Sequence, residues 1–139
     1  MVEWNPGLIG SVQRYNPTVA GTEPVAVPSS VRLTASAPGD ELDIDVTAYS
    51  LAFIELDDDM TLTLSNVPDL GAGCWSVRLV IEQGDGPFAI TWPTVRWVAG
   101  TAPTLSATLG DLDVIDLFTM DGGSTWFGVV VGQAFAEPA

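Results

Sequence analysis

The feature that most constrains the fold is an alternation of apolar and polar residues that starts near residue 31 and continues to the end of the chain. In the segment ELDIDVTAY, Leu42, Ile44 and Val46 alternate with Asp43 and Asp45. The segments MTLTL, CWSVRLVIE, FAITW, DVIDLFTM and WFGVVVG follow the same rule. A period of two places successive side chains on opposite faces of a β-strand. No segment shows the spacing of an amphipathic helix, so the pattern predicts an all-β protein.

Short clusters of Gly, Pro and Asp separate these segments, at residues 38–40, 57–59, 68–71, 84–87, 110–111 and 121–123. Such residues tolerate positive φ or fix one dihedral angle of a turn. Many short strands joined by turns, without helices between them, are typical of an antiparallel β-sandwich or jelly roll. We therefore predict one such domain over residues 31–139.

Residues 1–30 differ from the rest, because they hold four prolines and three glycines and show little periodicity. Proline and glycine at this density disfavour both helices and inner strands. We predict an extended N-terminal arm that docks on its own domain or on a neighbouring subunit. Trp4, Leu8, Ile9 and Tyr15 are the expected anchors. The first ten residues lack the pattern of a secretory signal peptide, so we expect synthesis in the cytoplasm.

The charge of the chain is strongly unbalanced, with 18 acidic residues against four arginines, no lysine, no histidine and a net charge of -14. Phosphate binding needs clustered Lys or Arg, so neither nucleic acid nor an anionic membrane is an expected partner. No apolar segment reaches the ~20 residues of a membrane-spanning helix.

The missing histidine and the single cysteine exclude several kinds of site. Without histidine, no Ser-His or Cys-His nucleophile pair can form. Cys74 alone permits neither an intrachain disulfide nor a cysteine-based zinc site, and we predict that it is a small buried filler rather than a reactive thiol. We expect no cofactor and no bound metal.

Two acidic clusters are the candidates for chemistry. Residues 57–59 are three consecutive aspartates. Their carboxylates either bind a calcium ion or lie in a hairpin turn exposed to solvent. The second cluster is Asp111, Asp113 and Asp116. Two of these residues could supply the pair of carboxyl groups that glycoside hydrolysis needs. Alternatively, they occupy polar positions of a strand, and Asp116 forms an ion pair with an arginine such as Arg96. The second interpretation is the simpler one, and we expect no enzyme activity.

The segment DGGSTW, residues 121–126, has glycines that a phosphate-binding loop also uses, but no lysine follows them. We predict a hairpin turn that leads into the last strand.

The tryptophans divide into two groups. Trp75 and Trp126 are in phase with apolar neighbours, which predicts burial in the core. Trp92 precedes Pro93, which cannot donate to a sheet ladder, and Trp97 stands in a second short segment. Trp92 and Trp97 are therefore either a platform for a sugar or part of a packed corner where the chain bends, and the pattern favours the corner.

From about residue 61 onward the chain resembles the C-terminal β-sandwich module of bacteriophage tail-fibre proteins and related virion surface proteins. The resemblance lies in the pattern TWP-x-V-x-W-x-x-G-x-x-P-x-L, followed by DVIDLFTMDGG and a Trp-aromatic-Gly strand. The matching positions are Gln83, Trp92, Pro93, Val95, Trp97, Gly100, Pro103, Leu105, Asp113, Asp121, Gly122, Gly123 and Trp126. The resemblance implies a non-enzymatic β-sandwich that assembles on a virion, commonly as a trimer.

A short chain with an N-terminal arm suits a head decoration or cement protein better than a full fibre. Its expected location is then the virion, assembled in the host cytoplasm, and its expected partner is the major capsid protein or another virion protein. The alternative is a tail-fibre or head-fibre knob that binds host glycans through Trp92 and Trp97.

Overall fold

The computed structural model describes residues 29–69, 71 and 73–138, and the structural statements that follow concern these residues. They consist almost wholly of strands, with one turn of 3-10 helix, η1, at Val98–Gly100. The strands are β2 (Ser30–Ala35), β3 (Asp40–Asp45), β4 (Leu51–Leu56), β5 (Met60–Ser65), β6 (Trp75–Gln83), β7 (Ile90–Thr91), β8 (Val95–Trp97), β9 (Leu112–Thr119) and β10 (Trp126–Phe135). The all-β prediction is confirmed.

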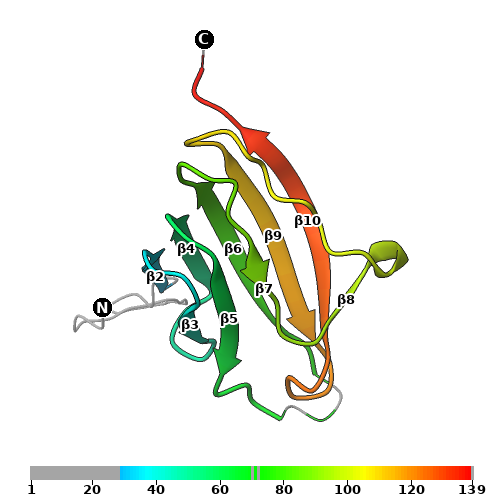
Figure 1. Ribbon diagram of the computed structural model, residues 1–139. Coiled ribbons are helices and arrows are strands. Elements are labelled where there is room, and N and C mark those ends of the chain that lie inside the picture. Colours follow the sequence, from blue (N-terminus) through cyan, green and yellow to red (C-terminus); the bar gives the residue numbers. More distant parts are fainter. Residues whose placement is uncertain (1–28, 70, 72, 139) are drawn as a thin grey trace, which may run out of the picture.

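The strands form two sheets (Figure 1). A six-stranded sheet has the order β2-β4-β6-β9-β10-β8, and a three-stranded sheet has the order β3-β5-β7. Among the described strands, only the β6–β9 and β9–β10 pairs are antiparallel. The pairs β2–β4, β4–β6, β3–β5, β5–β7 and β8–β10 are parallel. The prediction of antiparallel sheets is therefore wrong for most of the molecule.

The parallel pairing follows from the path of the chain. Between β2 and β8 the chain alternates between the two sheets. The parallel neighbours β2–β4, β4–β6, β3–β5 and β5–β7 are therefore two strands apart in sequence. The turns at residues 36–39 and 57–59 consequently join strands of different sheets. The sequence predicts a hairpin turn at residues 57–59, and this prediction is wrong, because β4 and β5 belong to different sheets.

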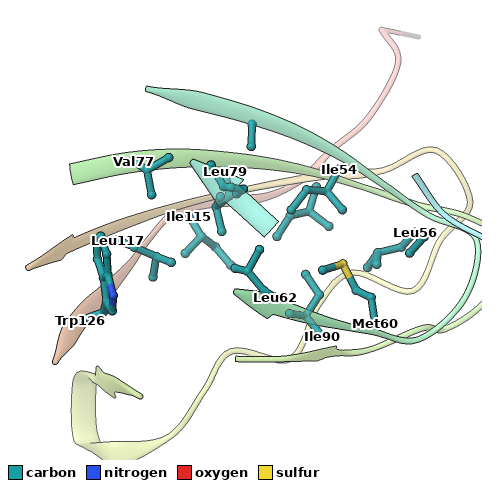
Figure 2. Close-up of a cluster of buried hydrophobic side chains, with 14 of the residues drawn as sticks. Ile54, Leu56, Met60, Leu62, Val77, Leu79, Ile90, Ile115, Leu117 and Trp126 are labelled. Carbon is teal, nitrogen blue, oxygen red and sulfur yellow. The ribbon is translucent and has the colours of Figure 1, made fainter. Parts of the chain in front are cut away.

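One hydrophobic core lies between the two sheets (Figure 2). Ile54, Leu79 and Ile115 of the six-stranded sheet point toward Met60 and Leu62 of the three-stranded sheet, and all five are at most 2% exposed. Fully burying one such side chain stabilises the fold by roughly 1.5–3 kcal/mol. The predicted alternation is confirmed at these positions, since the residues between them in each strand are half-buried or exposed.

Two predictions about single residues need correction. Cys74 is exposed, because it stands just before β6 begins, outside the alternating part of the strand. Trp75 is only half-buried: it packs against the edge of the core, and its indole Nε1 donates a hydrogen bond to the Val46 carbonyl at 2.9 Å. Trp126 is buried as predicted, with 2% of its surface exposed.

Among residues 29–69, 71 and 73–138, no helix is both long enough and apolar enough to cross a membrane.

Candidate interaction surface

The six-stranded sheet turns one face toward the core and the other face away from it. The outward positions follow from the strand register, in which Phe53, Val80 and Val114 form one row across β4, β6 and β9. We call this surface the outer face. It consists of Arg32 and Thr34 of β2, Leu51, Phe53 and Glu55 of β4, Ser76, Arg78, Val80 and Glu82 of β6, Leu112, Val114, Asp116 and Phe118 of β9, Phe127, Val129 and Phe135 of β10, and Arg96 of β8.

The outer face is apolar at its centre and toward β10. Phe53, Val80 and Val114 are half-buried, and Phe118 stacks on Phe127 with the ring centroids 5.1 Å apart. Val129 is 43% exposed and Phe135 is 51% exposed. None of these residues belongs to the core or packs against it. In the described part of the chain, this large sheet therefore leaves an apolar surface without a covering layer.

Every arginine within the described residues, namely Arg32, Arg78 and Arg96, lies on the outer face. The Arg78 guanidinium donates two hydrogen bonds to the Asp116 carboxylate, at 2.7 and 2.8 Å. Arg78, rather than the expected Arg96, is thus the partner of Asp116, because β6 and β9 place the two residues directly opposite each other. The Asp116 carboxylate raises the pKa of Arg78 above its usual value.

Arg32 and Arg96 lie over aromatic rings. The Arg32 guanidinium is 4.2 Å from the Phe53 ring centroid and donates to Glu55, with Nε at 3.1 Å. This hydrogen bond lowers the pKa of Glu55. The Arg96 guanidinium lies 5.9 Å from the Phe127 ring. These contacts hold the cations flat against the sheet, where their stems extend the apolar surface.

The outward face of the three-stranded sheet has the opposite character. We call it the acidic face, and it consists of Glu41, Asp43, Asp45, Thr61, Thr63, Ser65 and Thr91. Thr63 and Ser65 donate to the Asp43 carboxylate at 2.8 and 2.6 Å. Hydrogen bonds from Thr47 and Asn66 lower the pKa of Asp45. Short hydroxyl side chains and ionised carboxylates suit contact with water.

Trp92 and Trp97 form the bent, packed corner that the sequence favours. The chain passes there from β7 in the small sheet to β8 in the large sheet, and the two rings meet edge to face with centroids 5.1 Å apart and planes at 72°. Trp97 also packs against Gly128, where an added Cβ would overlap the indole ring. The two rings line different hollows, so they do not form a shared flat platform.

The hollow beside Trp97 has a volume of about 370 Å³ and lies at the β8 end of the outer face. Arg96, Phe118, Phe127 and Val129 also line it. It combines three half-buried aromatic side chains with one guanidinium, and it is continuous with the apolar part of the sheet.

The aspartates proposed for glycoside hydrolysis lie apart. Asp113 points inward and is 2% exposed, whereas Asp116 points outward from the same strand. Asp111 precedes β9, at the turn. Two carboxyl groups on opposite faces of a sheet cannot flank one glycosidic bond, so Asp113 and Asp116 are not a catalytic pair.

Asp113 instead fixes the loops around β9. Its carboxylate accepts hydrogen bonds from the Ser106 backbone nitrogen and hydroxyl, at 2.7 and 2.6 Å. It also accepts one from the Ala134 backbone nitrogen at 3.0 Å and a longer one, at 3.3 Å, from the Gln133 side chain. The adjacent buried Gln83 bridges two loop segments: its Nε2 donates a hydrogen bond to the Ser106 carbonyl at 2.8 Å, and its Oε1 accepts one from the Phe88 nitrogen at 3.0 Å.

The aspartates at residues 57–59 are used within the protein. The Asp59 carboxylate accepts a hydrogen bond from the Ala89 nitrogen at 2.8 Å, and the Asp58 carboxylate accepts one from the Asp59 nitrogen. Within residues 29–69, 71 and 73–138, no group of three or more acidic or Cys side chains is arranged to hold a metal ion.

Residues 121–126 form the predicted hairpin turn between β9 and β10. The Thr125 nitrogen donates to the Asp121 carboxylate at 2.9 Å, and the Gly123 nitrogen donates to the buried Thr119 hydroxyl at 3.0 Å. The first of these hydrogen bonds lowers the pKa of Asp121.

The predicted arm falls almost wholly outside the described residues. This includes Trp4, Leu8, Ile9 and Tyr15, so their docking role stays a prediction.

Sequence reasoning did not identify the outer face. The signal is nevertheless present in strands that have apolar residues on both faces. In LAFI, residues 51–54, Ala52 and Ile54 face the core while Leu51 and Phe53 face outward. A strand of this kind has two apolar faces, and only one of them can belong to the core.

Comparison with known proteins finds no matching family model, no matching curated protein and no matching solved structure.

Proposed function

We propose that the protein is a non-enzymatic structural protein of a bacteriophage particle, namely a decoration or cement protein that assembles on the head surface and stabilises it. The proposal rests on the resemblance of residues 61 onward to virion surface modules, given above. One structural observation supports an assembling protein in particular. The outer face is a broad apolar surface on an otherwise acidic domain, and such surfaces mark sites of protein–protein contact.

The rest of the molecule fits the same role. Its buried polar groups, Gln83 and Asp113, are occupied in holding loops, and the aspartates first considered for catalysis form turns or an ion pair. In the proposal, residues 1–30 contact the major capsid protein or another virion protein, with Trp4, Leu8, Ile9 and Tyr15 as anchors. A tethered arm of this kind adds contacts at high effective concentration. In the proposal the copies also assemble with one another, and the resemblance implies a trimer.

The test is mass spectrometry and electron microscopy of purified virions from the phage that carries this gene. We expect the full-length chain in stoichiometric amounts on the head. A chain with Trp4→Ser, Ile9→Ser and Tyr15→Ser should add back to depleted particles at least about tenfold more weakly, the equivalent of about 1.4 kcal/mol. A chain that is absent from virions would refute the proposal.

The second candidate is a tail-fibre or head-fibre knob that binds host glycans, and the hollow beside Trp97 favours it. Sugar rings stack on the faces of aromatic side chains, of which Trp97, Phe118 and Phe127 line this hollow, and Arg96 could bind a hydroxyl or carboxylate group of the glycan. A glycan array separates the two functions. A knob should bind one glycan class and lose it on Arg96→Ala, whereas a decoration protein should bind none.

A further inference from the structure

We infer that the outer face binds a second copy of this chain. The inference rests on the proposed function and deepens it, because it names the surface through which an assembling protein meets itself. It starts from the charge of the face. Arg32, Arg78 and Arg96 are balanced there by three acidic residues, Glu55, Glu82 and Asp116. The outer face is therefore neutral.

The remaining surface is not neutral. Of the 18 acidic residues, Glu3 and Glu23 fall outside the described residues and three lie on the outer face, which leaves thirteen elsewhere, all but the buried Asp113 with some exposure to solvent. No arginine balances these thirteen within the described residues. Two copies that approach through any other surface bring like charges together, which costs free energy at short range. Among the surfaces that the described residues form, the outer face is the broad one at which two copies meet without this repulsion.

The same charges argue against a charged partner. A cationic partner would be drawn to the thirteen unbalanced carboxylates rather than to a neutral sheet, and an anionic partner would be repelled by the whole molecule. A neutral apolar surface matches another neutral apolar surface, and every second copy presents one. Because both copies use the same face, the contact is two-fold and gives a dimer, unlike the trimer that the resemblance implies. Sheets also pack face to face readily, at about 10 Å separation, when their facing side chains are apolar.

The area of the face predicts how strong the contact is. Six strands spaced by ~4.8 Å, with about six residues per strand at ~3.3 Å each, give on the order of 500 Å² per copy. A pair of copies would bury on the order of 1,000 Å², which is the lower end for specific interfaces. We therefore expect reversible self-association rather than an obligate oligomer. Added salt should strengthen it by screening the repulsion between the two acidic bodies.

The experiment is sedimentation velocity of the full-length chain over a concentration series, at about 0.05 M and about 0.5 M NaCl, where the Debye length falls severalfold. Val80→Asp places a charge at the centre of the face, and Val129→Asp places one at an exposed position that the fold tolerates more easily. Thr63→Asp adds the same charge on the acidic face and is the matched control. Circular dichroism checks that each variant is folded.

We expect the wild-type chain to self-associate, more tightly at high salt, and Val129→Asp to weaken association at least about tenfold, the equivalent of about 1.4 kcal/mol. Thr63→Asp should change it less than about twofold. A wild-type chain that stays monomeric at every concentration and salt, or a Thr63→Asp chain that loses association as much as Val129→Asp, overturns the inference. A chain that stays monomeric but attaches to virions would refute this inference and leave the proposed function in place. A chain that self-associates but is absent from virions would refute the proposed function and leave this inference in place.

Discussion

At the scale of single residues, buried polar groups determine where the loops around β9 lie. The Asp113 carboxylate is 2% exposed and accepts hydrogen bonds from Ser106 and Ala134. Asp113→Ala would leave these donors without a partner, and an unpaired buried group costs about 1–3 kcal/mol. We expect urea denaturation to show a loss of about 2–3 kcal/mol. Asp85→Ala, at an exposed turn, should lose less than about 0.5 kcal/mol, and equal losses would contradict this role for Asp113.

Gly128 is required by the tryptophan corner. An added Cβ at this position would overlap the Trp97 indole, which is itself held by Trp92. Gly128→Ala should therefore destabilise the protein by about 1–3 kcal/mol, the usual cost of overpacking. Its tryptophan fluorescence should also shift. Gly132→Ala is the control on the same strand, since it would meet only the half-exposed Phe135 ring, which can turn away. A control as damaging as the Gly128 variant would show that β10 tolerates no Cβ at either glycine.

The hairpin turn at residues 121–126 gives the protein a dependence on pH. The pKa of Asp121 is lowered in the folded state by its hydrogen bond from the Thr125 nitrogen. The stabilisation is therefore present above the unfolded pKa of about 4, and it is lost as the pH falls through the lower folded pKa. Asp121→Asn should reduce the loss of stability between about pH 5 and pH 2, as measured by thermal unfolding at several pH values. Asp85→Asn removes an equal charge at an exposed turn and should leave the wild-type pH dependence in place. A variant curve parallel to that of the wild type would rule the Asp121 contribution out.

At the scale of elements, the strands differ in how many neighbours hold them. β6 lies between β4 and β9, and β9 lies between β6 and β10, whereas β7 is two residues long and pairs only with β5. Amide exchange follows such differences, because central strands open only on global unfolding. We expect the slowest exchange at Leu79, Ile81 and Ile115 and exchange at least about a hundredfold faster in β7 and η1, as measured by hydrogen exchange with mass spectrometry. Uniform protection across both sheets would contradict this ranking.

The strands themselves could be predicted from the sequence, but their partners could not. Alternation at Leu42, Ile44 and Val46 specifies which side chains face the core, and burial of Ile44 and Val46 confirms it. Alternation does not specify which strand lies alongside. The turn residues at 57–59 would suit a hairpin equally well, yet β4 and β5 belong to different sheets. That choice depends on long-range packing, and a local pattern does not contain it.

The candidate site was predictable to a smaller extent. The corner at Trp92 and Trp97 could be predicted because Pro93 ends a ladder, a local constraint. The sequence predicted that Asp116 could pair with an arginine, but it did not identify which one. Arg78 becomes its neighbour only through the antiparallel register of β6 and β9. The outer face was missed because its residues come from six strands whose order the sequence does not reveal.

At the scale of the whole molecule, charge and apolar surface are distributed separately. The outer face combines the arginines with the exposed aromatic and valine side chains, while the acidic face presents carboxylates and hydroxyls. Because the two faces belong to different sheets, they point away from each other across the shared core. The inferred contact with a second copy therefore uses the side of the domain opposite the acidic face, and the acidic face remains in contact with water.

The net charge of -14 also predicts how salt changes the stability of the fold. Compaction brings 18 carboxylates together against four arginines, and self-repulsion of this kind destabilises the native state. Salt also weakens the exposed ion pairs Arg78–Asp116 and Arg32–Glu55. Isolated surface ion pairs contribute little to stability, so the relief of the repulsion should determine how stability changes with salt. We expect the thermal midpoint to rise by several degrees, about 3–6 °C, between about 0.02 M and 0.5 M NaCl. The measurement should use the Val129→Asp chain at two low protein concentrations, which separates this effect from self-association. A midpoint that falls with salt would show that the ion pairs outweigh the repulsion.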